Sequence, residues 1–542
     1  MIDSALNIES GARLEADVVV IGGGAAGITI AKRLAGKSLR VVVLESGPLQ
    51  FDSFAQSLYS GAIVGQPTDA LDVGRLRFFG GSTNHWGGWC RPLEPSDFSK
   101  RADWPESGWP ISRQDIETYY QDAGALCQLG PTSFDDPAYW QAQPGGGQLV
   151  PFALDSSLLR NVVFQVSLIK FGTAYGTELK AAQNVRVILD ATVLELLPAK
   201  DSGANRIRKS VGEVLVTAKG AKQFTVAARN FVVACGGVET ARLLLLSDKI
   251  NPTGAGNEND LVGRYFMDHL WMTTAAFLRF SRDGTDAPFY FRHTLVSGAR
   301  VFAAISSAPE LIEREKIGAF RFVLEPTRTS TAGLDSTRTL VDQLRHGAIP
   351  DHLSEHLGNI LSDFDIIADS AYKTVTGSKQ GWLTEDPNAP YKGAWIDLNF
   401  EQRPNPESRV LLDSAQDALG QRRVKLDWRL SETDRQTATR SLDIIAREFG
   451  RLGLGRTRIR LDLANGGAWP GEMKGSDHHS GTARMSDSAK TGVVDSNCLV
   501  HSTDNLYVAG SAVFPTGGYA NPTLTIVALA LRLADHLERI HA

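Results

Sequence analysis

Short apolar runs and glycine clusters alternate along the first fifty residues. A run rich in β-branched residues, 17–21, precedes a glycine-rich segment, 22–27, a helical stretch to about Leu34, and a second apolar run at 40–44. Continuous apolar runs of this length are typical of buried parallel strands. The pattern therefore predicts a β-α-β unit, the opening of a doubly wound sheet.

The same strand–glycine–helix pattern returns twice. Residues 231–235 predict a buried strand that turns at Gly236 and Gly237 into a helix over 238–246. Residues 505–509 predict a strand that is followed by glycine turns and by an apolar helix from Pro522. We therefore expect the first domain to be discontinuous and closed by both ends of the chain.

Elsewhere apolar positions alternate with polar ones, as in strands with one solvated face. Three alternating segments predict a small β-meander, at 185–189, 213–217 and 224–227. The middle of the chain predicts strands at 394–400, 409–412 and 424–428, a helix over about 433–449, and an irregular helical insert at 330–365. The expected fold class is α/β, with an α+β part in the middle.

Composition narrows the class of protein. A chain of 542 residues is too long to fold around a single core. Its shares of hydrophobic residues, 42%, and charged residues, 22%, are ordinary for a globular protein. A net charge of −5 provides no basic field for nucleic acid or an anionic membrane. The four cysteines are scattered, residues 1–15 lack an apolar signal segment, and no uncharged run is long enough to span a bilayer. We expect a cytoplasmic protein with no metal site and no membrane span.

The first motif that carries chemistry is Gly22-x-Gly24-x-x-Gly27, followed by Glu45. Gly22 permits a tight turn, Gly24 lets the backbone approach a pyrophosphate, and Gly27 lets the helix pack against the strand. The helix start supplies free N–H groups, and Glu45 is placed to accept hydrogen bonds from a ribose 2′-hydroxyl. An acidic residue at this position favours NAD or FAD over NADP.

A second motif is the segment 79–88, which is dense in glycine and small polar residues and has no periodicity. This composition predicts a loop. Its backbone suits close contact with a flat polar ring, and an ordinary surface loop is the alternative.

Two motifs near the C-terminus add candidate catalytic groups. The segment 478–485 begins with His478 and His479, and a neutral imidazole suits removal of an alcohol proton near pH 7. In the segment 505–523, Asn521 fits a helix N-cap and Pro522 fits the first helical residue. The positive end of the helix that follows suits a negative charge. A structural histidine and a simple helix cap are the alternatives.

In this order and spacing, the motifs resemble the glucose–methanol–choline (GMC) oxidoreductase family over nearly the whole chain. The pair His85-Trp86 and the segment 109–120 are most similar to bacterial sugar dehydrogenases and pyranose oxidases. The resemblance implies a Rossmann-like FAD domain of the glutathione-reductase type and a β-sheet substrate domain. The expected FAD domain comprises residues 1–99, 184–270 and 465–542, and the expected substrate domain comprises 100–183 and 271–464.

The resemblance also implies roles for individual residues. It matches the catalytic pair of the family to His478 and Asn521, with the adjoining His479 as the alternative base. The implied FAD contacts are Gly22, Gly24, Ala25, Ala26, Gly27 and Glu45 around the ADP half, Val193 at the adenosine, Gly80, Gly81, Ser82, Asn84, His85, Trp86 and Gly87 along the flavin, Gly510, Ser511, Pro522 and Thr523 at the ribityl and pyrimidine end, and also Cys235 and Gly236. A covalent link between FAD and His85 is compatible with the resemblance but is not favoured.

The resulting prediction is an FAD-dependent oxidase or dehydrogenase that oxidises an alcohol group of a small molecule, such as a sugar or glycoside. His478 would take the hydroxyl proton, Asn521 would hydrogen-bond the same oxygen, and a hydride would pass to flavin N5. The alternatives are a non-sugar alcohol as substrate, a lyase- or isomerase-like role, and FAD binding without turnover. An NAD dehydrogenase is disfavoured, because it needs neither the second glycine loop nor the C-terminal helix. The electron acceptor (oxygen, a quinone or a redox protein) and a homo-oligomeric state stay open.

Overall fold

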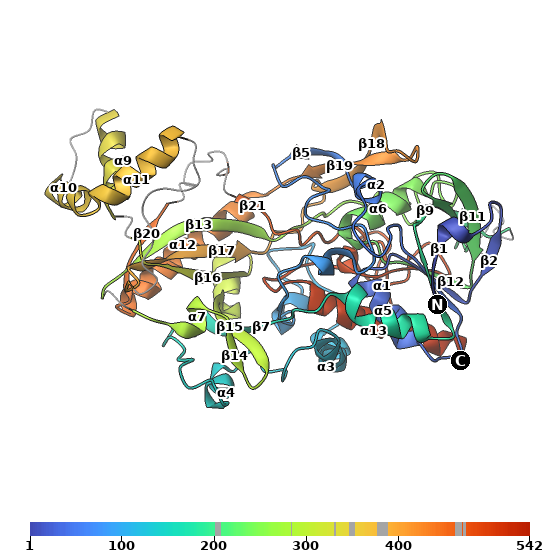
Figure 1. Cartoon of the computed structure of the whole chain (residues 1–542), viewed down its shortest axis with the longest axis horizontal. Helices are drawn as coiled ribbons and strands as arrows, with labels where there is room; N and C mark the ends of the chain where they lie inside the picture. Colours follow the sequence, from blue (N-terminus) through green and yellow to red (C-terminus); the bar gives the residue numbers. More distant parts are fainter. Residues whose placement is uncertain are drawn as a thin grey trace.

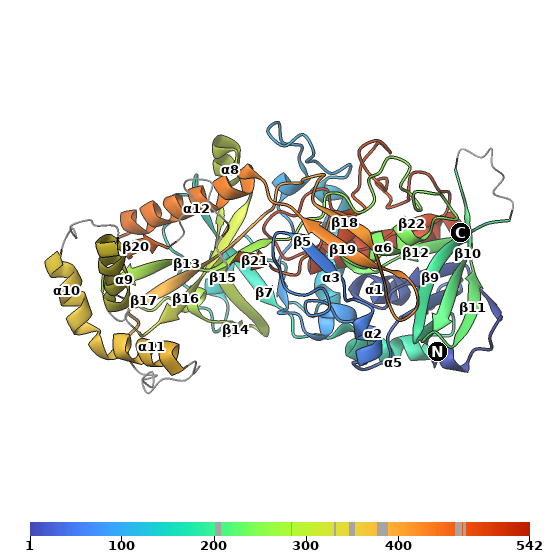
Figure 2. The same ribbon diagram turned by 90° about the horizontal axis from the view of Figure 1, so that it is seen from above.

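A computed structural model describes residues 1–200, 208–282, 285–329, 332–345, 353–376, 389–460, 469 and 473–542. The molecule is elongated, with a parallel sheet at the end that holds both termini and an antiparallel sheet towards the other end (Figures 1 and 2). Three helices project beyond the antiparallel sheet: α9 (Ala332–Arg345), α10 (Leu353–Ser362) and α11 (Phe364–Thr376). They confirm a helical insert in the described part of 330–365.

Fully buried runs of β-branched residues build the parallel sheet, as its sequence pattern predicts. Its strand order is β1 (Ile2–Ser4), β8 (Val185–Leu189), β4 (Val41–Leu44), β3 (Val18–Ile21), β12 (Asn230–Val233) and β22 (Leu506–Val508). The helices that follow β3, β12 and β22 are α1 (Ala25–Leu34), α6 (Gly236–Leu246) and α13 (Thr523–His541). Helix α1 packs against α13 and against α5 (Phe171–Ala181). The three predicted strand–glycine–helix units are therefore confirmed.

The predicted β-meander is only partly right. An antiparallel sheet contains β9 (Ala191–Pro198), β10 (Val211–Ala218) and β11 (Lys222–Ala227), and β2 (Arg13–Glu15) extends it in parallel. Residues 185–189 instead form β8, which lies between β1 and β4 of the parallel sheet. Four of the five residues of β8 are buried, so the strand needs cover on both faces.

The antiparallel sheet dominates the other end of the molecule (Figure 1). Its main path is β20 (Gly455–Ile459), β13 (Leu270–Phe280), β17 (Gly393–Phe400), β16 (Phe320–Thr327), β15 (Ala299–Ser307), β7 (Leu159–Val166) and β6 (Trp89–Cys90), with β14 (Thr294–Val296) on β15 and β21 (Met473–Gly475) on β13. Helix α12 (Glu432–Arg451) packs on β20, β13 and β17. The predicted strand at 394–400 and helix at 433–449 are confirmed.

A small fourth sheet joins strands from the two expected domains. It contains β18 (Arg409–Gln416), β19 (Arg422–Trp428) and β5 (Ala62–Gly65), and β19 runs parallel to β5. Strands thus pair across the expected domain boundaries, which stay a prediction, and the boundary at 464/465 lies outside the described residues. The connections contain α2 (Ser53–Ser57), α3 (Glu117–Leu126), α4 (Pro137–Ala142), α7 (Pro288–Phe291) and α8 (Pro309–Glu315).

Close packing of α1 on the turn before it makes a first prediction. A Cβ atom at Gly27 would overlap the carbonyl oxygen of Gly22, so the main chain would have to move. We expect Gly27→Ala to lower the free energy of unfolding by about 2 kcal/mol in urea titrations. Gly124 in α3 is the matched control, because a Cβ there meets a single side-chain atom at 4.0 Å. Gly124→Ala should be neutral or stabilising by up to about 1 kcal/mol. Equal stability of the two variants would contradict this packing.

Candidate active site

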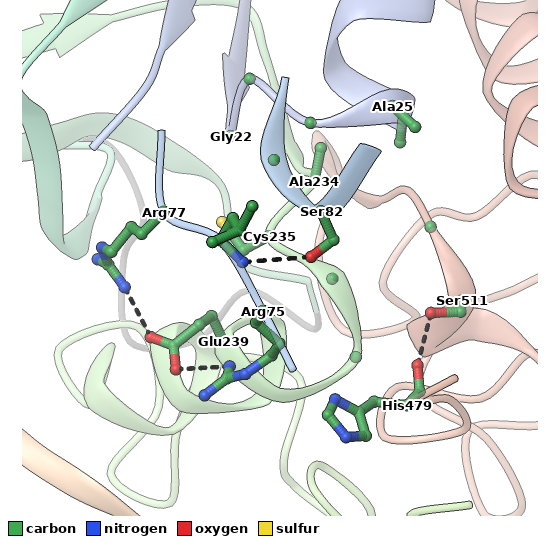
Figure 3. A pocket seen from close by; sticks show the side chains of 18 of the residues that line it. Gly22, Ala25, Arg75, Arg77, Ser82, Ala234, Cys235, Glu239, His479 and Ser511 are labelled. Carbon is green, nitrogen blue, oxygen red and sulfur yellow. Dashed lines mark hydrogen bonds and ion pairs between the residues drawn. The ribbon is translucent and has the colours of Figure 1, made fainter. Parts of the chain in front are cut away.

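A cavity of about 500 Å³ opens where β3, β4, β12 and β22 end. In an open parallel sheet, the carboxyl ends of the strands are the usual place for a ligand. Most of the predicted site residues line this cavity, and Figure 3 shows part of its wall. They are Gly22, Gly24, Ala25, Ala26, Glu45, Gly81, Ser82, His85, Trp86, Gly87, Val193, Cys235, Gly236, His478, Gly510, Ser511, Asn521, Pro522 and Thr523.

Three predicted cofactor residues are not part of the cavity wall: Gly27, Gly80 and Asn84. Gly27 packs behind the turn, and Gly80 has a φ of 100°, which favours glycine. The Asn84 Nδ2 atom donates to the carbonyl oxygens of Phe79, at 3.1 Å, and Gly81, at 3.0 Å. These residues shape the loop from behind, and part of that loop is a short 3₁₀ helix, Gly81–Asn84, rather than irregular chain.

The turn between β3 and α1 is built for close approach. Gly22 has a φ of 109°, and a Cβ atom there would lie 2.5 Å from the carbonyl oxygen of Ala234. Gly24 precedes α1 without a side-chain cap, and a Cβ atom there would meet nothing within 4 Å. The first N–H groups of α1 therefore face open space, which is the arrangement of an anion site.

Glu45 closes the same end of the cavity. Its Oε2 atom accepts from the N–H of Gly23 at 2.7 Å, and its Oε1 atom accepts from the N–H of Gly47 at 2.8 Å. Burial raises the pKa of Glu45, and these two backbone bonds act against that shift. A carboxylate oxygen with one such bond can still accept a second, from a ligand hydroxyl.

Sequence analysis missed a largely buried ion cluster in the cavity wall (Figure 3). Glu239 on α6 pairs with Arg75 and with Arg77, each at 3.1 Å, and with Arg242 at 3.3 Å. Burial acts to raise the pKa of Glu239, but the three arginines lower it to about 2. The guanidinium groups of Arg75 and Arg77 also stack on the ring of Tyr59. Arg242 also pairs with Asp417 at 2.6 Å, so two carboxylates and three arginines hold this part of the wall together.

His478 and Asn521 meet at the opposite end of the site. The Nε2 atom of His478 lies 3.2 Å from the Nδ2 atom of Asn521. The other ring nitrogen, Nδ1, lies 2.8 Å from the Nδ1 atom of His269, just before β13. Burial lowers the pKa of His478 well below its ordinary value, and the neighbouring His269, Arg321 and His479 act in the same direction. His478 is therefore neutral.

The structure corrects the predicted role of Asn521 as a helix cap. The N-cap of α13 is Pro522, and no side chain caps this helix. The Oδ1 atom of Asn521 instead accepts from Nη2 of Arg321 on β16, at 3.2 Å. Neither His269 nor Arg321 belongs to a motif, so no sequence pattern indicates them.

The neighbouring His479 points elsewhere. Its Nε2 atom lies 3.7 Å from Oδ2 of Asp268, and its carbonyl oxygen accepts from Oγ of Ser511 at 2.6 Å (Figure 3). Burial lowers the pKa of His479 to about 3 and raises the pKa of Asp268 to about 8. The pair is therefore neutral, and the His478 ring is the one beside Asn521.

Comparisons with known proteins agree with this arrangement. Residues 17–255 match the family model of FAD dependent oxidoreductases, and residues 404–530 match the model of GMC oxidoreductases. The chain is 24% identical to 2-methyl-1,2-propanediol dehydrogenase of Mycolicibacterium austroafricanum, over 97% of this chain and 95% of the relative. It is 23% identical to the fructose dehydrogenase large subunit of Gluconobacter japonicus, over 96% and 97%. The crystal structure of pyridoxine 4-oxidase from Mesorbium loti has a TM-score of 0.53 and 16% identity, over 96% and 98%.

The fold and the matches define a flavin-dependent oxidoreductase that acts on CH–OH groups, with FAD as cofactor and a Rossmann-type FAD domain. More specifically, the chain combines an FAD dependent oxidoreductase domain with a C-terminal domain of the GMC oxidoreductase family. The expected family, α/β fold class and cofactor are thereby confirmed. Along the described part of the chain, no helix combines the length and the apolar character needed to cross a bilayer.

Asp268 gives the stability of the protein a pH dependence. The pKa of an aspartate in the unfolded chain is about 4, whereas burial and the charge of Asp477 raise that of Asp268 to about 8. The folded state therefore holds a proton that the unfolded state has lost, so this group lowers stability as pH rises from about 4 to about 8. Asp268→Asn keeps the oxygen that accepts from the N–H of His478. We expect the Tm of the wild type to fall more steeply than that of the variant between about pH 5 and 8. If the Tm values of the wild type and the variant change with pH in parallel, Asp268 is ionised in the folded protein and the prediction is wrong.

Proposed function

We propose that this enzyme oxidises an alcohol group of a sugar or glycoside, with His478 as the base and Asn521 as its partner. The observation that carries the proposal is the distance of 3.2 Å between His478 Nε2 and Asn521 Nδ2 in the wall of a cavity that begins at the glycine turn. A substrate hydroxyl group that takes the place of the Asn521 N–H at Nε2 can donate to the imidazole and accept from the amide. The two residues then polarise the same O–H bond.

The cavity residues fit FAD. The uncapped start of α1 at Gly24 would hold the pyrophosphate, and Glu45 would accept from the ribose. The remaining predicted contacts, at Val193, in the loop 81–87 and after β22, lie along the same wall. When bound, FAD supplies the acceptor for the hydride that leaves the substrate carbon.

The protein side of the reaction follows from the neutral imidazole. His478 can take the hydroxyl proton because its pKa is low enough to leave Nε2 unprotonated in the resting enzyme. Asn521 donates to the same oxygen without adding charge. The N-terminus of α13 lies at this end of the cavity, and its positive end stabilises negative charge that develops there. Orientation of substrate by these fixed groups removes much of the entropic cost of reaction.

The substrate class is the finer part of the proposal. The fructose dehydrogenase large subunit supports a sugar, and the diol dehydrogenase keeps a non-sugar alcohol as the alternative. The electron acceptor is proposed to be oxygen, a quinone or a redox protein. Anaerobic bleaching of the flavin by a panel of sugars, glycosides and alcohols identifies the substrate, and reoxidation by oxygen or a dye identifies the acceptor. A flavin that no alcohol bleaches would contradict the proposal.

All four cysteines are free thiols, which supports the predicted cytoplasmic location.

Gly24 offers a direct test of the cofactor site. A Cβ atom at this position meets no protein atom within 4 Å, so a larger side chain would occupy ligand space without distorting the fold. We expect Gly24→Val to purify folded, with circular dichroism like that of the wild type, but to lose the visible absorption of FAD. Full flavin content in this variant would contradict the proposed position of the pyrophosphate.

The catalytic pair is tested by stopped-flow reduction of the flavin. Loss of a general base typically slows reaction by roughly 10² to 10⁴, so His478→Ala should slow flavin reduction by that factor while FAD stays bound. Asn521→Ala should slow it by roughly 10² through the lost hydrogen bond, with little change in Tm because this side chain does not cap α13. If His479→Ala slows flavin reduction more than His478→Ala does, the base is His479 and the assignment to His478 is wrong.

A further inference from the structure

Arg321 on β16 is a buried cation without a counter-ion among the described residues. The residue is 4% exposed, and its contacts among the described residues are the carbonyl oxygen of Tyr519, Oδ1 of Asn521 and the rings of Trp89 and Phe164. An unpaired buried charge is costly to a fold. A residue that carries this cost at a catalytic end is a candidate for a role in the reaction.

The contacts of Arg321 fix the direction of a chain of hydrogen bonds. A guanidinium group only donates, so the Asn521 atom that faces it must be the acceptor, Oδ1. The Nδ2 atom, a donor, is therefore turned to Nε2 of His478, which must be an unprotonated acceptor. A neutral imidazole carries one proton, so the proton of His478 is on Nδ1.

His269 completes the chain. The Nδ1–H group of His478 faces Nδ1 of His269, which must accept and therefore carries its own proton on Nε2. Main-chain groups of Gly517 and Gly518 hydrogen-bond to the His269 ring, and a Cβ atom at Gly517 would lie 3.3 Å from Nε2. Burial lowers the pKa of His269 to about 4, so this ring is neutral as well.

We propose that Arg321 and His269 are positioning residues, which together hold His478 in the Nδ1–H tautomer. Its Nε2 atom is then unprotonated and can act as the base. Arg321 fixes the orientation of the Asn521 amide, and His269 keeps the proton of His478 on Nδ1. The inference rests on the proposed function, because it assigns the state of the proposed base. Neither residue touches the substrate in this scheme.

The charge of Arg321 has a second effect on His478. Four groups face this imidazole: His269 before β13, Arg321 on β16, His479 and Asp268. The Oδ1 atom of Asp268 accepts from the main-chain N–H of His478. Of these, only Arg321 is charged at neutral pH, since the pKa shifts leave the other three neutral. Its positive charge opposes protonation of His478, so removing it should extend inhibition by acid to higher pH.

Variants of Arg321 separate its two effects when flavin reduction in the holoenzyme is followed against pH. Arg321→Met should lower the rate at neutral pH at least tenfold. It should also raise, by about one pH unit, the pH below which the rate falls, which is the acid limb of the profile. Arg321→Gln keeps an N–H donor for Asn521 without charge, so it should move the limb with a smaller loss of rate. Arg321→Lys keeps the charge and should leave the limb in place.

The tautomer can be observed directly. In holoenzyme labelled with ¹⁵N-histidine, the His478 signals are those that disappear in His478→Ala, and they should report a protonated Nδ1 and a free Nε2. His269→Leu removes the acceptor and should shift protons to Nε2, with a loss of rate of at least tenfold. His269→Asn places an oxygen near the lost Nδ1 and should restore most of the wild-type spectrum and rate.

A merely structural role is excluded with Arg484, a second buried arginine that lies outside the cavity wall. Arg484→Met should lower the Tm and leave the pH profile and the His478 tautomer unchanged. If Arg321→Met, Arg321→Gln and His269→Leu all keep the wild-type tautomer and acid limb, the inference is wrong. That result would leave the proposed function intact, because the proposed function is tested separately, by bleaching of the flavin with alcohols and by the rate of flavin reduction in His478→Ala. If Arg321→Met does not fold, Arg321→Gln alone decides the outcome.

Discussion

The pairing of β12 with β3 on one side and with β22 on the other is the interaction on which the site depends. In this register Val233 lies opposite both Ile21 and Val508. The turns that follow these three strands therefore leave the sheet at one edge, although the strands come from the beginning, the middle and the end of the chain. The turn after β3 then approaches the chain after β12 so closely that Gly22 has no room for a side chain. A shift of one residue in the pairing of β12 with β3 would move these two turns apart.

A second pairing sets the catalytic end. Met267 and Ser480 exchange two main-chain hydrogen bonds, of 3.0 and 2.9 Å, which fix the short segments that carry His269 and His478 side by side. Asp268 adds a bond to the N–H of His478. The antiparallel sheet thus does more than cover the cavity. Through β13 and β16 it supplies both outer groups of the hydrogen-bonded chain, whereas the parallel part of the fold supplies the glycine turn.

The sequence predicts those features whose physical cause is local. Buried β-branched runs and the glycines of the β3–α1 turn are legible because each depends on its immediate neighbours. The sequence does not predict His269, Arg321 or the Arg75–Glu239 pair, because their partners are fixed by strands and loops distant in the chain. Asn521 shows how such a partner overrides a local preference. Its residue type fits an N-cap, but the guanidinium of Arg321 binds the oxygen that a cap would use.

Burial removes charge from nearly every titratable group around His478, and among the described groups that act on its pKa only Arg321 stays charged. A histidine that received a proton beside Arg321 would form a second positive charge among buried groups, where charges are poorly screened. Protonation of His478 is therefore unfavourable in the resting enzyme and becomes favourable only when negative charge develops close by. Loss of the alcohol proton and departure of the hydride are consequently expected to be tightly linked, because the electrons that leave the substrate carbon provide that negative charge within the same cavity. An unpaired arginine, costly to the fold, is in this way consistent with a base that stays neutral until substrate is in place.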